Sequence, residues 1–239
     1  MKLKTAKLLC SRAELATLPE GKLLINTINA FSYNNAQKDS LFAEALEKGG
    51  ALIPDGASIV KACRWIDAQY KPTERIAGWD LFAFEMDRLN QRGGGRVMFL
   101  GSSERVLALI REKAATVYPR LEVVTYSPPY KPVFSDEDNR QMVEAINRAN
   151  PDLLWIGMTA PKQEKWTYSH WDELQIHCHV GTIGAVFDFF AGVTERAPLW
   201  WQEHSLEWLY RLIKEPRRMW KRYLIGNVEF VCRVLKERL

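Results

Sequence analysis

The feature that most constrains this chain is an alternation of short apolar segments with longer amphipathic ones along most of its 239 residues. The apolar segments have strand length and lie at residues 22–27, 51–56, 96–103, 121–127, 151–158 and 176–181. Between them apolar residues recur with helical spacing, in segments 40–49, 58–69, 78–95, 104–115, 136–150 and 161–171. Strands separated by helices form right-handed βαβ units. The pattern therefore predicts an α/β fold with a mostly parallel sheet flanked by helices.

The pattern changes after about residue 195, where two helical segments follow each other with no strand between them. In the second, one face carries the apolar residues Trp220, Tyr223, Leu224, Val228, Val231 and Leu235. We predict a catalytic domain at residues 1–195 and a helical appendage at 196–239.

The predicted appendage carries the excess positive charge of the chain. Its ten Lys and Arg and five Asp and Glu give it a net charge of +5, whereas the whole chain carries +4. It also holds Trp200, Trp201, Trp208 and Trp220, four of the nine tryptophans. Basic residues interleaved with tryptophan fit a surface that meets anionic lipid headgroups. They also fit nucleic acid, where aromatic side chains stack on bases.

Several protein classes are disfavoured by what the sequence lacks. No run reaches the roughly 18 apolar residues of a membrane-spanning helix, and the first residues turn charged too soon for a signal peptide. We therefore expect a cytoplasmic protein. The four cysteines are scattered and predict free thiols. The pair His177 and His179 lies in a strand-like segment without nearby carboxylates, so we expect no metal site there.

Polar residues follow the predicted strands where the chain turns into the next helix. They are Thr27 and Asn29, Asp55 and Gly56, Gly101 with Ser102 and Ser103, the segment 159–164, and the segment 181–188. In an open parallel sheet, ligands bind beyond the carboxyl ends of the strands. We therefore predict that these five loops converge on one site.

Asp55 is the strongest candidate for a catalytic residue among them. Held between Pro54 and Gly56, its carboxylate could take a proton from an attacking hydroxyl group. The same three residues also make an ordinary turn, and spacing alone does not separate the two interpretations.

The other loop residues carry weaker signals. Gly101 and Ser102 could present backbone N–H groups to a diphosphate, or form a plain turn from strand to helix. Glu164 and its neighbour Gln163 could belong to the site by position. Glu164 could equally be an ordinary acidic residue in the first turn of a helix, where it interacts favourably with the helix dipole. Asp188, among phenylalanines, needs a partner and fits either a functional role or a structural hydrogen bond.

Without a metal, a leaving diphosphate needs cationic side chains or helix N-termini. The available cations are Arg75, Arg196, Arg211, Arg217, Arg218, Lys221 and Arg222. For any single one in the appendage, a solvated helix face is the simpler interpretation.

Several longer motifs of the sequence resemble those of one protein family. The first half carries Thr27 to Asn29, the Pro-Asp-Gly turn at 54–56 and ERIAGWDL at 74–81. The second half carries GMTAPKQEKW at 157–166, GTIGAVFDFFAG at 181–192, RAPLW at 196–200, LEWLYRL at 206–212, EPRR at 215–218 and RYLIGN at 222–227. Together, over roughly residues 20–230, they resemble the WecG/TagA/CpsF glycosyltransferases (glycosyltransferase family 26).

The resemblance implies a Rossmann-like body, a UDP-sugar donor and an inverting transfer without a metal cofactor. It also implies an undecaprenyl-diphosphate-linked acceptor at the inner face of the cytoplasmic membrane, with peripheral attachment there. The sugar would be N-acetylmannosamine, its uronic acid or a related hexose, for teichoic acid, enterobacterial common antigen, capsule or exopolysaccharide.

The resemblance also assigns roles to residues. It makes Asp55 the general base, with Thr27 beside it. It places Asn29, Arg75 and Gln163 among the polar residues of the same pocket, and Arg211, Arg218, Lys221 and Arg222 in a basic appendage that meets the lipid diphosphate. To these we add, as further expected donor and substrate contacts, Gly56, Asp80, Gly101, Ser102, Glu164, Gly184, Phe187 and Asp188. Arg196 and Arg217 are added as further expected contacts to the lipid diphosphate and membrane.

Three positions depart from the family pattern. The glycine-rich loop after the central strand is shortened to Gly101, Ser102 and Ser103; Ser205 stands where glycine is usual; and Ala30 and Phe31 follow Asn29 where an acidic second residue is common.

Two other functions fit parts of the sequence. A nicotinamide-dependent oxidoreductase or epimerase is disfavoured because the chain lacks a GxGxxG loop and a Tyr/Lys pair at short-chain spacing. A non-enzymatic adaptor for membrane or nucleic acid would rest on the basic tail alone. We predict a membrane partner rather than nucleic acid, and the apolar faces of the tail could also support a homo-oligomer.

Overall fold

The computed structural model describes residues 1–238 and, within them, every side chain except that of Arg218. In that range six strands form one parallel sheet in the order β2-β1-β6-β5-β3-β4. The strands are β1 (Leu23–Ile28), β2 (Ala51–Pro54), β3 (Gly95–Gly101), β4 (Leu121–Tyr126), β5 (Leu153–Gly157) and β6 (His179–Thr182). The predicted α/β fold with a mostly parallel sheet is confirmed.

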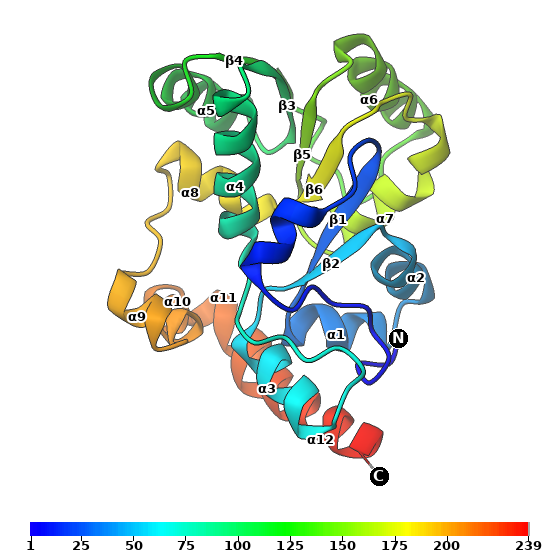
Figure 1. The fold of residues 1–239 in the computed structure, drawn as a ribbon, viewed down its shortest axis with the longest axis vertical. Coiled ribbons are helices and arrows are strands. Elements are labelled where there is room, and N and C mark those ends of the chain that lie inside the picture. Colours follow the sequence, from blue (N-terminus) through cyan, green and yellow to red (C-terminus); the bar gives the residue numbers. More distant parts are fainter. Residues whose placement is uncertain (239) are drawn as a thin grey trace.

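Helices cover both faces of this sheet (Figure 1). They are α1 (Ala30–Ala36), α2 (Ser40–Lys48), α3 (Ala57–Trp65), α4 (Gly78–Gln91), α5 (Glu104–Val117), α6 (Asp136–Ala149), α7 (Lys162–Ser169) and α8 (Gly184–Ala191), with the short 3-10 helices η1 (Arg12–Thr17) and η2 (Trp171–Glu173). Helices α4, α5 and α8 pack on one face, and α6 and α7 pack on the other.

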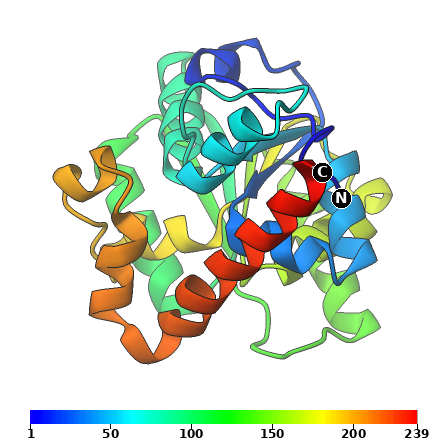
Figure 2. The ribbon, with the colours of Figure 1, turned by 90° about the horizontal axis from the view of Figure 1, so that it is seen from below.

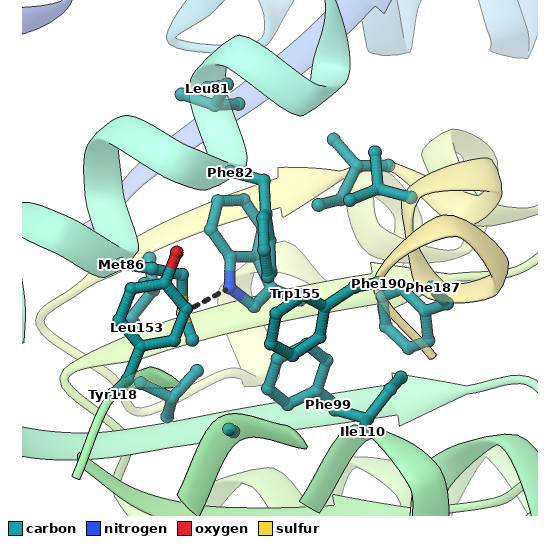
Figure 3. Close-up of a cluster of buried hydrophobic side chains, with 14 of the residues drawn as sticks. Leu81, Phe82, Met86, Phe99, Ile110, Tyr118, Leu153, Trp155, Phe187 and Phe190 are labelled. Carbon is teal, nitrogen blue, oxygen red and sulfur yellow. Dashed lines mark hydrogen bonds between the residues drawn. The ribbon is translucent and has the colours of Figure 1, made fainter. Parts of the chain in front are cut away.

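The two faces follow from the alternation of side chains along each strand. In β5, Leu153 and Trp155 belong to the core under α4, α5 and α8, whereas Leu154 and Ile156 belong to the core under α6 and α7. Because both faces are buried, β5 is apolar along its whole length. Figure 3 shows Trp155 in the first core, with its indole N–H 3.4 Å from the sulfur of Met86.

Local signals set several helix starts. Asp39 accepts a hydrogen bond from the backbone N–H of Phe42 at the start of α2. Ser103 does the same for Val106 at the start of α5. Ser135 and Asp138 form a reciprocal capping box on α6. Each cap satisfies backbone N–H groups that the first helical turn leaves without partners.

After α8 a non-helical connection spans 192–198, and helices then follow one another to the end of the described range. This C-terminal segment contains α9 (Leu199–Glu203), α10 (Glu207–Lys214), α11 (Pro216–Trp220), the π-helical turn η3 (Lys221–Ile225) and α12 (Gly226–Arg238). Figure 2 shows α12 crossing the carboxyl side of the sheet beside α1, while α9 and α10 lie at the edge of the molecule.

Helix α12 is joined to the body by a buried seam. Phe230 and Val234 lie in the core that includes Tyr33 of α1. The Tyr33 hydroxyl donates to the Glu237 carboxylate, and the Asn34 amide donates to the Gly226 carbonyl at 2.7 Å. The outward face of the same segment stays apolar and exposed.

The structure also differs in detail from the expected elements. The last strand begins at His179 rather than 176, after residues that pack beneath α6. Helix α8 occupies a stretch expected only as a loop after a strand, and α1 lies where no helix or strand was expected. For α1 the physical reason is Asn29, whose side chain accepts from the Ser32 N–H and starts a helix directly at the strand end.

Candidate active site

A cavity of about 1600 Å³ opens at the carboxyl ends of the strands, between the α/β body and the C-terminal segment. All five predicted loops contribute to its wall. The predicted site residues on it are Thr27, Asn29, Asp55, Gly56, Arg75, Ser102, Gln163, Glu164, Gly184, Asp188, Arg196, Arg211 and Arg222.

Asp55 follows β2 directly and is held by its backbone. Its N–H donates to the Ile28 carbonyl of β1 at 2.9 Å, and its own carbonyl accepts from Arg75 Nε at 2.8 Å. The Asp55 carboxylate lies 3.1 Å from Arg75 Nη2. The 26% of its side chain that remains accessible faces the cavity that it lines.

The charges around Asp55 oppose one another. Burial raises the pKa of its carboxyl, the Arg75 guanidinium works against that rise, and the Glu207 carboxylate adds to it. Arg211 has a smaller lowering effect on the same pKa. The balance leaves Asp55 with a higher proton affinity than an exposed aspartate, which suits a general base.

Thr27 and Asn29 bring the end of β1 to the same place. Thr27 is paired in register with Ile53 of β2, two residues before Asp55. The loops approach so closely that a Cβ on Gly56 would lie 3.2 Å from Asn29 Cα. Glycine therefore lets the two strand ends share one wall of the cavity.

Gln163 and Glu164 form a second polar cluster, at the start of α7. The Gln163 side-chain oxygen accepts from the backbone N–H groups of Met158 at 3.2 Å and Gly184 at 3.1 Å. Its amide nitrogen donates to Glu164 Oε1 at 2.9 Å. This arrangement requires glycine at 184, because a Cβ there would lie 2.2 Å from the Met158 carbonyl oxygen.

Glu164 is a buried acid at the cavity wall. Its side chain is 1% exposed, and within residues 1–238 its Oε2 atom has no hydrogen-bond partner. Burial raises the pKa of this carboxyl to about 7, against the effect of the Gln163 hydrogen bond. Glu164 therefore exists in both protonation states near neutral pH.

The polar groups of the loop after β3 form hydrogen bonds within the protein. The N–H of Ser102 donates to the Gly157 carbonyl at 2.9 Å, and the Ser103 hydroxyl caps α5. Gly101 adopts φ 129° and a Cβ there would meet the same carbonyl oxygen at 2.2 Å. Ser102 lines the cavity, but its backbone N–H is already engaged.

Cationic side chains come from the C-terminal segment and stack on aromatic rings of the body. The Arg196 guanidinium lies 5.5 Å from the Trp79 ring centroid, and that of Arg211 lies 5.2 Å from Phe189. Burial lowers the pKa of Arg196. Arg222 lies over Phe31 at 4.5 Å. These stacking contacts hold three positive charges at the rim of the cavity.

Some predicted residues lie elsewhere. Phe187 is fully buried against Phe99 in the core and does not line the cavity. Asp80 accepts from the Ala77 N–H at 2.8 Å and lies 3.4 Å from Arg12, so it stabilises the start of α4. Arg217 and Lys221 are exposed outside the cavity. The side chain of Arg218 lies outside the described residues.

Other cavity residues were not anticipated. Glu207 places its carboxylate 2.9 Å from Arg75 Nη1, across the interface between body and C-terminal segment. Lys131 and Lys162 line the opposite rim, where the Lys162 ammonium lies 3.4 Å from the Phe134 ring centroid. The proline-rich segment around Lys131 marks a loop in the sequence, but nothing in the sequence pairs Glu207 with Arg75.

The described residues form neither a cluster of metal ligands nor a membrane-spanning helix. Among residues 1–238, no three His, Cys, Asp or Glu side chains come together as ligands for a metal ion. Both ring nitrogens of His179 lie near protein oxygens, at 2.9 Å from Glu85 and 2.9 Å from the Pro19 carbonyl. None of the helices in the described range has the length and apolar character needed to cross a membrane.

Comparison with known proteins finds a matching family and similar proteins. The profile of the glycosyl transferase WecG/TagA/CpsF family matches residues 2–239. The N-acetylglucosaminyldiphosphoundecaprenol N-acetyl-beta-D-mannosaminyltransferase of Bacillus subtilis (strain 168) is 30% identical, over 90% of this chain and 79% of that protein. The protein of the same name in Bacillus spizizenii is 30% identical over 95% and 84%. That of Staphylococcus aureus (strain MW2) is 25% identical over 87% and 76%.

Proposed function

Because this chain belongs to the glycosyl transferase WecG/TagA/CpsF family, we propose that it transfers a sugar from a UDP donor to a saccharide carried on undecaprenyl diphosphate. The family match confirms the resemblance inferred from the sequence motifs. The names of the Bacillus relatives support the acceptor class and an N-acetylmannosamine-type sugar. The observation that carries the proposal is one cavity that joins Asp55, Thr27 and Gln163 with a cationic rim.

The size of the cavity supports two substrates. Pockets for single small ligands are typically about 300–1,000 Å³. This cavity, at about 1600 Å³, has room for a nucleotide sugar together with the head of a lipid-linked acceptor. Because body and C-terminal segment each form part of the wall, both substrates would lie between them.

The chemistry we propose is a single displacement. Asp55 takes the proton of the acceptor hydroxyl, whose oxygen attacks the anomeric carbon from the face opposite UDP. The new bond joins this oxygen to the anomeric carbon, the bond from that carbon to the UDP oxygen breaks, and its electron pair leaves with UDP. The product has inverted configuration, and Asp55 then releases its proton to water.

The negative charge of the two diphosphates would be met by side chains. Arg196 and Arg211 are held at the cavity by their aromatic contacts, and Arg222, stacked on Phe31, lines the same cavity. Guanidinium groups bind phosphate oxygens with two parallel hydrogen bonds. We propose a metal-independent transfer in which these groups stabilise the leaving diphosphate.

The C-terminal segment would bring the site to the membrane. We propose that residues 1–195 act as the catalytic body and 196–239 as an appendage that lies on the inner face of the cytoplasmic membrane. Outside the cavity, the exposed large apolar residues of the segment are Leu199, Trp200, Ile213, Trp220, Leu224, Ile225, Val228 and Leu235. Arg217 and Lys221 are exposed on the same segment, and each basic residue near an anionic surface contributes about 1 kcal/mol.

A reconstituted transfer reaction tests this function. The full chain is incubated with a panel of labelled UDP-sugars and undecaprenyl-diphosphate-linked N-acetylglucosamine, and lipid-linked product and free UDP are measured. We expect one UDP released for each sugar transferred, an inverted linkage and no activity without acceptor. Thermal unfolding with UDP or NAD is the control. Protection by NAD, with no transfer from any UDP-sugar, would favour an oxidoreductase and overturn the proposal.

A further inference from the structure

A chain of three charged side chains runs from the cavity floor to the C-terminal segment. Arg75 Nη2 lies 3.1 Å from the Asp55 carboxylate, and Arg75 Nη1 lies 2.9 Å from the Glu207 carboxylate. One guanidinium is thus shared by two carboxylates that belong to different parts of the molecule.

The position of the guanidinium is set by the body. Arg75 Nε donates to the backbone carbonyl of Asp55 at 2.8 Å, so the same residue holds Arg75 through both its backbone and its side chain. Glu207 is the first residue of α10 and reaches Arg75 only when that helix lies on the cavity. The ion pair between Glu207 and Arg75 therefore forms only when the C-terminal segment is docked on the body.

The contact is shielded from solvent enough to affect proton affinity. The exposed fractions of the side chains are 23% for Arg75 and 12% for Glu207. Partly buried charges are screened less by salt and water than surface ones. A charge added to or removed from this group is therefore felt by Asp55.

Sharing the cation changes the electrostatic environment of Asp55. With Glu207 absent, the positive charge of Arg75 would act on Asp55 alone and would favour its ionised form. With Glu207 in place, part of that charge is neutralised, and Asp55 holds a proton more readily. The pKa of Asp55 is raised first by burial, with Arg75 lowering it, Glu207 raising it and Arg211 lowering it. Arg196 belongs to the same charged surroundings, because it interacts electrostatically with Glu207, Asp80, Arg75 and Asp55.

We propose that Glu207 is a positioning residue that acts through Arg75 and couples the docking of α10 to the readiness of Asp55 to accept a proton. This inference rests on the proposed role of Asp55 as general base. Its consequence is that Asp55 is a stronger base when Glu207 of the docked C-terminal segment contacts Arg75. Proton transfer is thus favoured when the wall that meets the acceptor is in place.

The test is the pH dependence of kcat/KM for the full chain with UDP-sugar and lipid-linked acceptor. Glu207→Gln removes the charge and keeps the shape, and Glu207→Asp keeps the charge. The matched control is Glu203→Gln, an exposed glutamate outside the cavity on α9. We expect Glu207→Gln to shift the acidic limb of the profile to lower pH by about half a unit or more and to lower the plateau. Glu207→Asp should keep the limb near its original position, and Glu203→Gln should leave the profile unchanged.

If Glu207 only held α10 in place, its substitution would have a different effect. Loss of activity in Glu207→Gln by the same factor at every pH, with an unmoved limb, would overturn the proposal, as would an unchanged profile. A direct titration of the Asp55 carboxyl by carbon-13 NMR tests the same claim without turnover, and an unshifted midpoint in Glu207→Gln contradicts it. Asp55→Asn distinguishes a failure of the proposed function from a failure of this inference. Full activity in that variant removes the proposed base, whereas an inactive Asp55→Asn with an unmoved Glu207→Gln midpoint removes only this inference.

Discussion

The two walls of the cavity are built in different ways. On the body side, Asp55 and Gln163 are fixed by backbone hydrogen bonds from neighbouring strand ends, above a core packed on both faces of the sheet. On the C-terminal side, Glu207 and the arginines depend on an ion pair and on stacking against rings of the body. We therefore propose that the group that takes part in bond making, Asp55, stands on the wall fixed by backbone hydrogen bonds, while the groups that meet the lipid-linked substrate stand on the C-terminal wall.

The largest expected effect concerns the outer face of the C-terminal segment. Leu224 and Val228 are 54% and 64% exposed, and neither lines the cavity. Replacing both by aspartate should weaken binding to vesicles of phosphatidylglycerol and phosphatidylcholine by about 100-fold or more, because two apolar contacts are lost and two repelled charges are added. Flotation or light scattering measures it.

The matched control is Val117→Asp, an exposed valine on the body. It should leave vesicle binding unchanged. Transfer to a soluble short-chain acceptor should also persist in the Leu224/Val228 double variant. Vesicle binding as strong as that of the unchanged chain would show that this face does not meet the membrane.

A smaller effect is expected at Glu164, on the rigid wall. The pKa of this carboxyl is about 7 when folded against the ordinary 4.5, so between those values the folded state keeps a proton that the unfolded state has lost. Its contribution to stability therefore falls as pH rises through this window, by up to about 3 kcal/mol. Glu164→Gln should remove that loss.

Urea unfolding at pH 5 and pH 8 measures the difference. The advantage of Glu164→Gln over the unchanged protein should grow by about 2–3 kcal/mol between the two pH values. Glu112→Gln, an exposed position on α5, corrects for the general effect of removing a carboxyl. An advantage that stays constant with pH would mean that Glu164 is not held with a raised pKa.

How far the sequence predicts this site depends on the range of the contacts. Asp55, Thr27 and Gln163 follow strands, and fold topology alone brings strand ends together. Phe187 and Asp80 were expected at the site by the resemblance, yet one packs in the core and the other holds a helix start. Which face of a short helix turns inward depends on packing that the local pattern does not contain.

Glu207 and Ser102 illustrate the same limit. Glu207 meets Arg75 across 132 residues of sequence, and only the docking of α10 decides that pair. Ser102 lies at the predicted place, but its N–H is taken by a strand that follows about 55 residues later in the chain. Long-range pairing therefore decides which polar groups remain available to substrates.

The smallest expected effect is at Ser205, which lies between α9 and α10. It adopts φ 60°, in the left-handed region that favours glycine. Ser205→Gly removes backbone strain but adds unfolded-state entropy, so the free energy of unfolding should change by less than about 1 kcal/mol. Ser205→Val should cost more than that, because branched side chains fit this region poorly. Equal stabilities of the two variants would contradict this account of the turn.

The most direct test of the central claim is the turnover of Asp55→Asn. The variant keeps the size of the side chain, and Asp172→Asn, an exposed aspartate in η2, is the control. With UDP-sugar and lipid-linked acceptor, and with folding verified by thermal unfolding, we expect kcat to fall by about 100-fold or more, while the control stays at the original rate. A turnover of Asp55→Asn close to that of the unchanged protein would contradict the account.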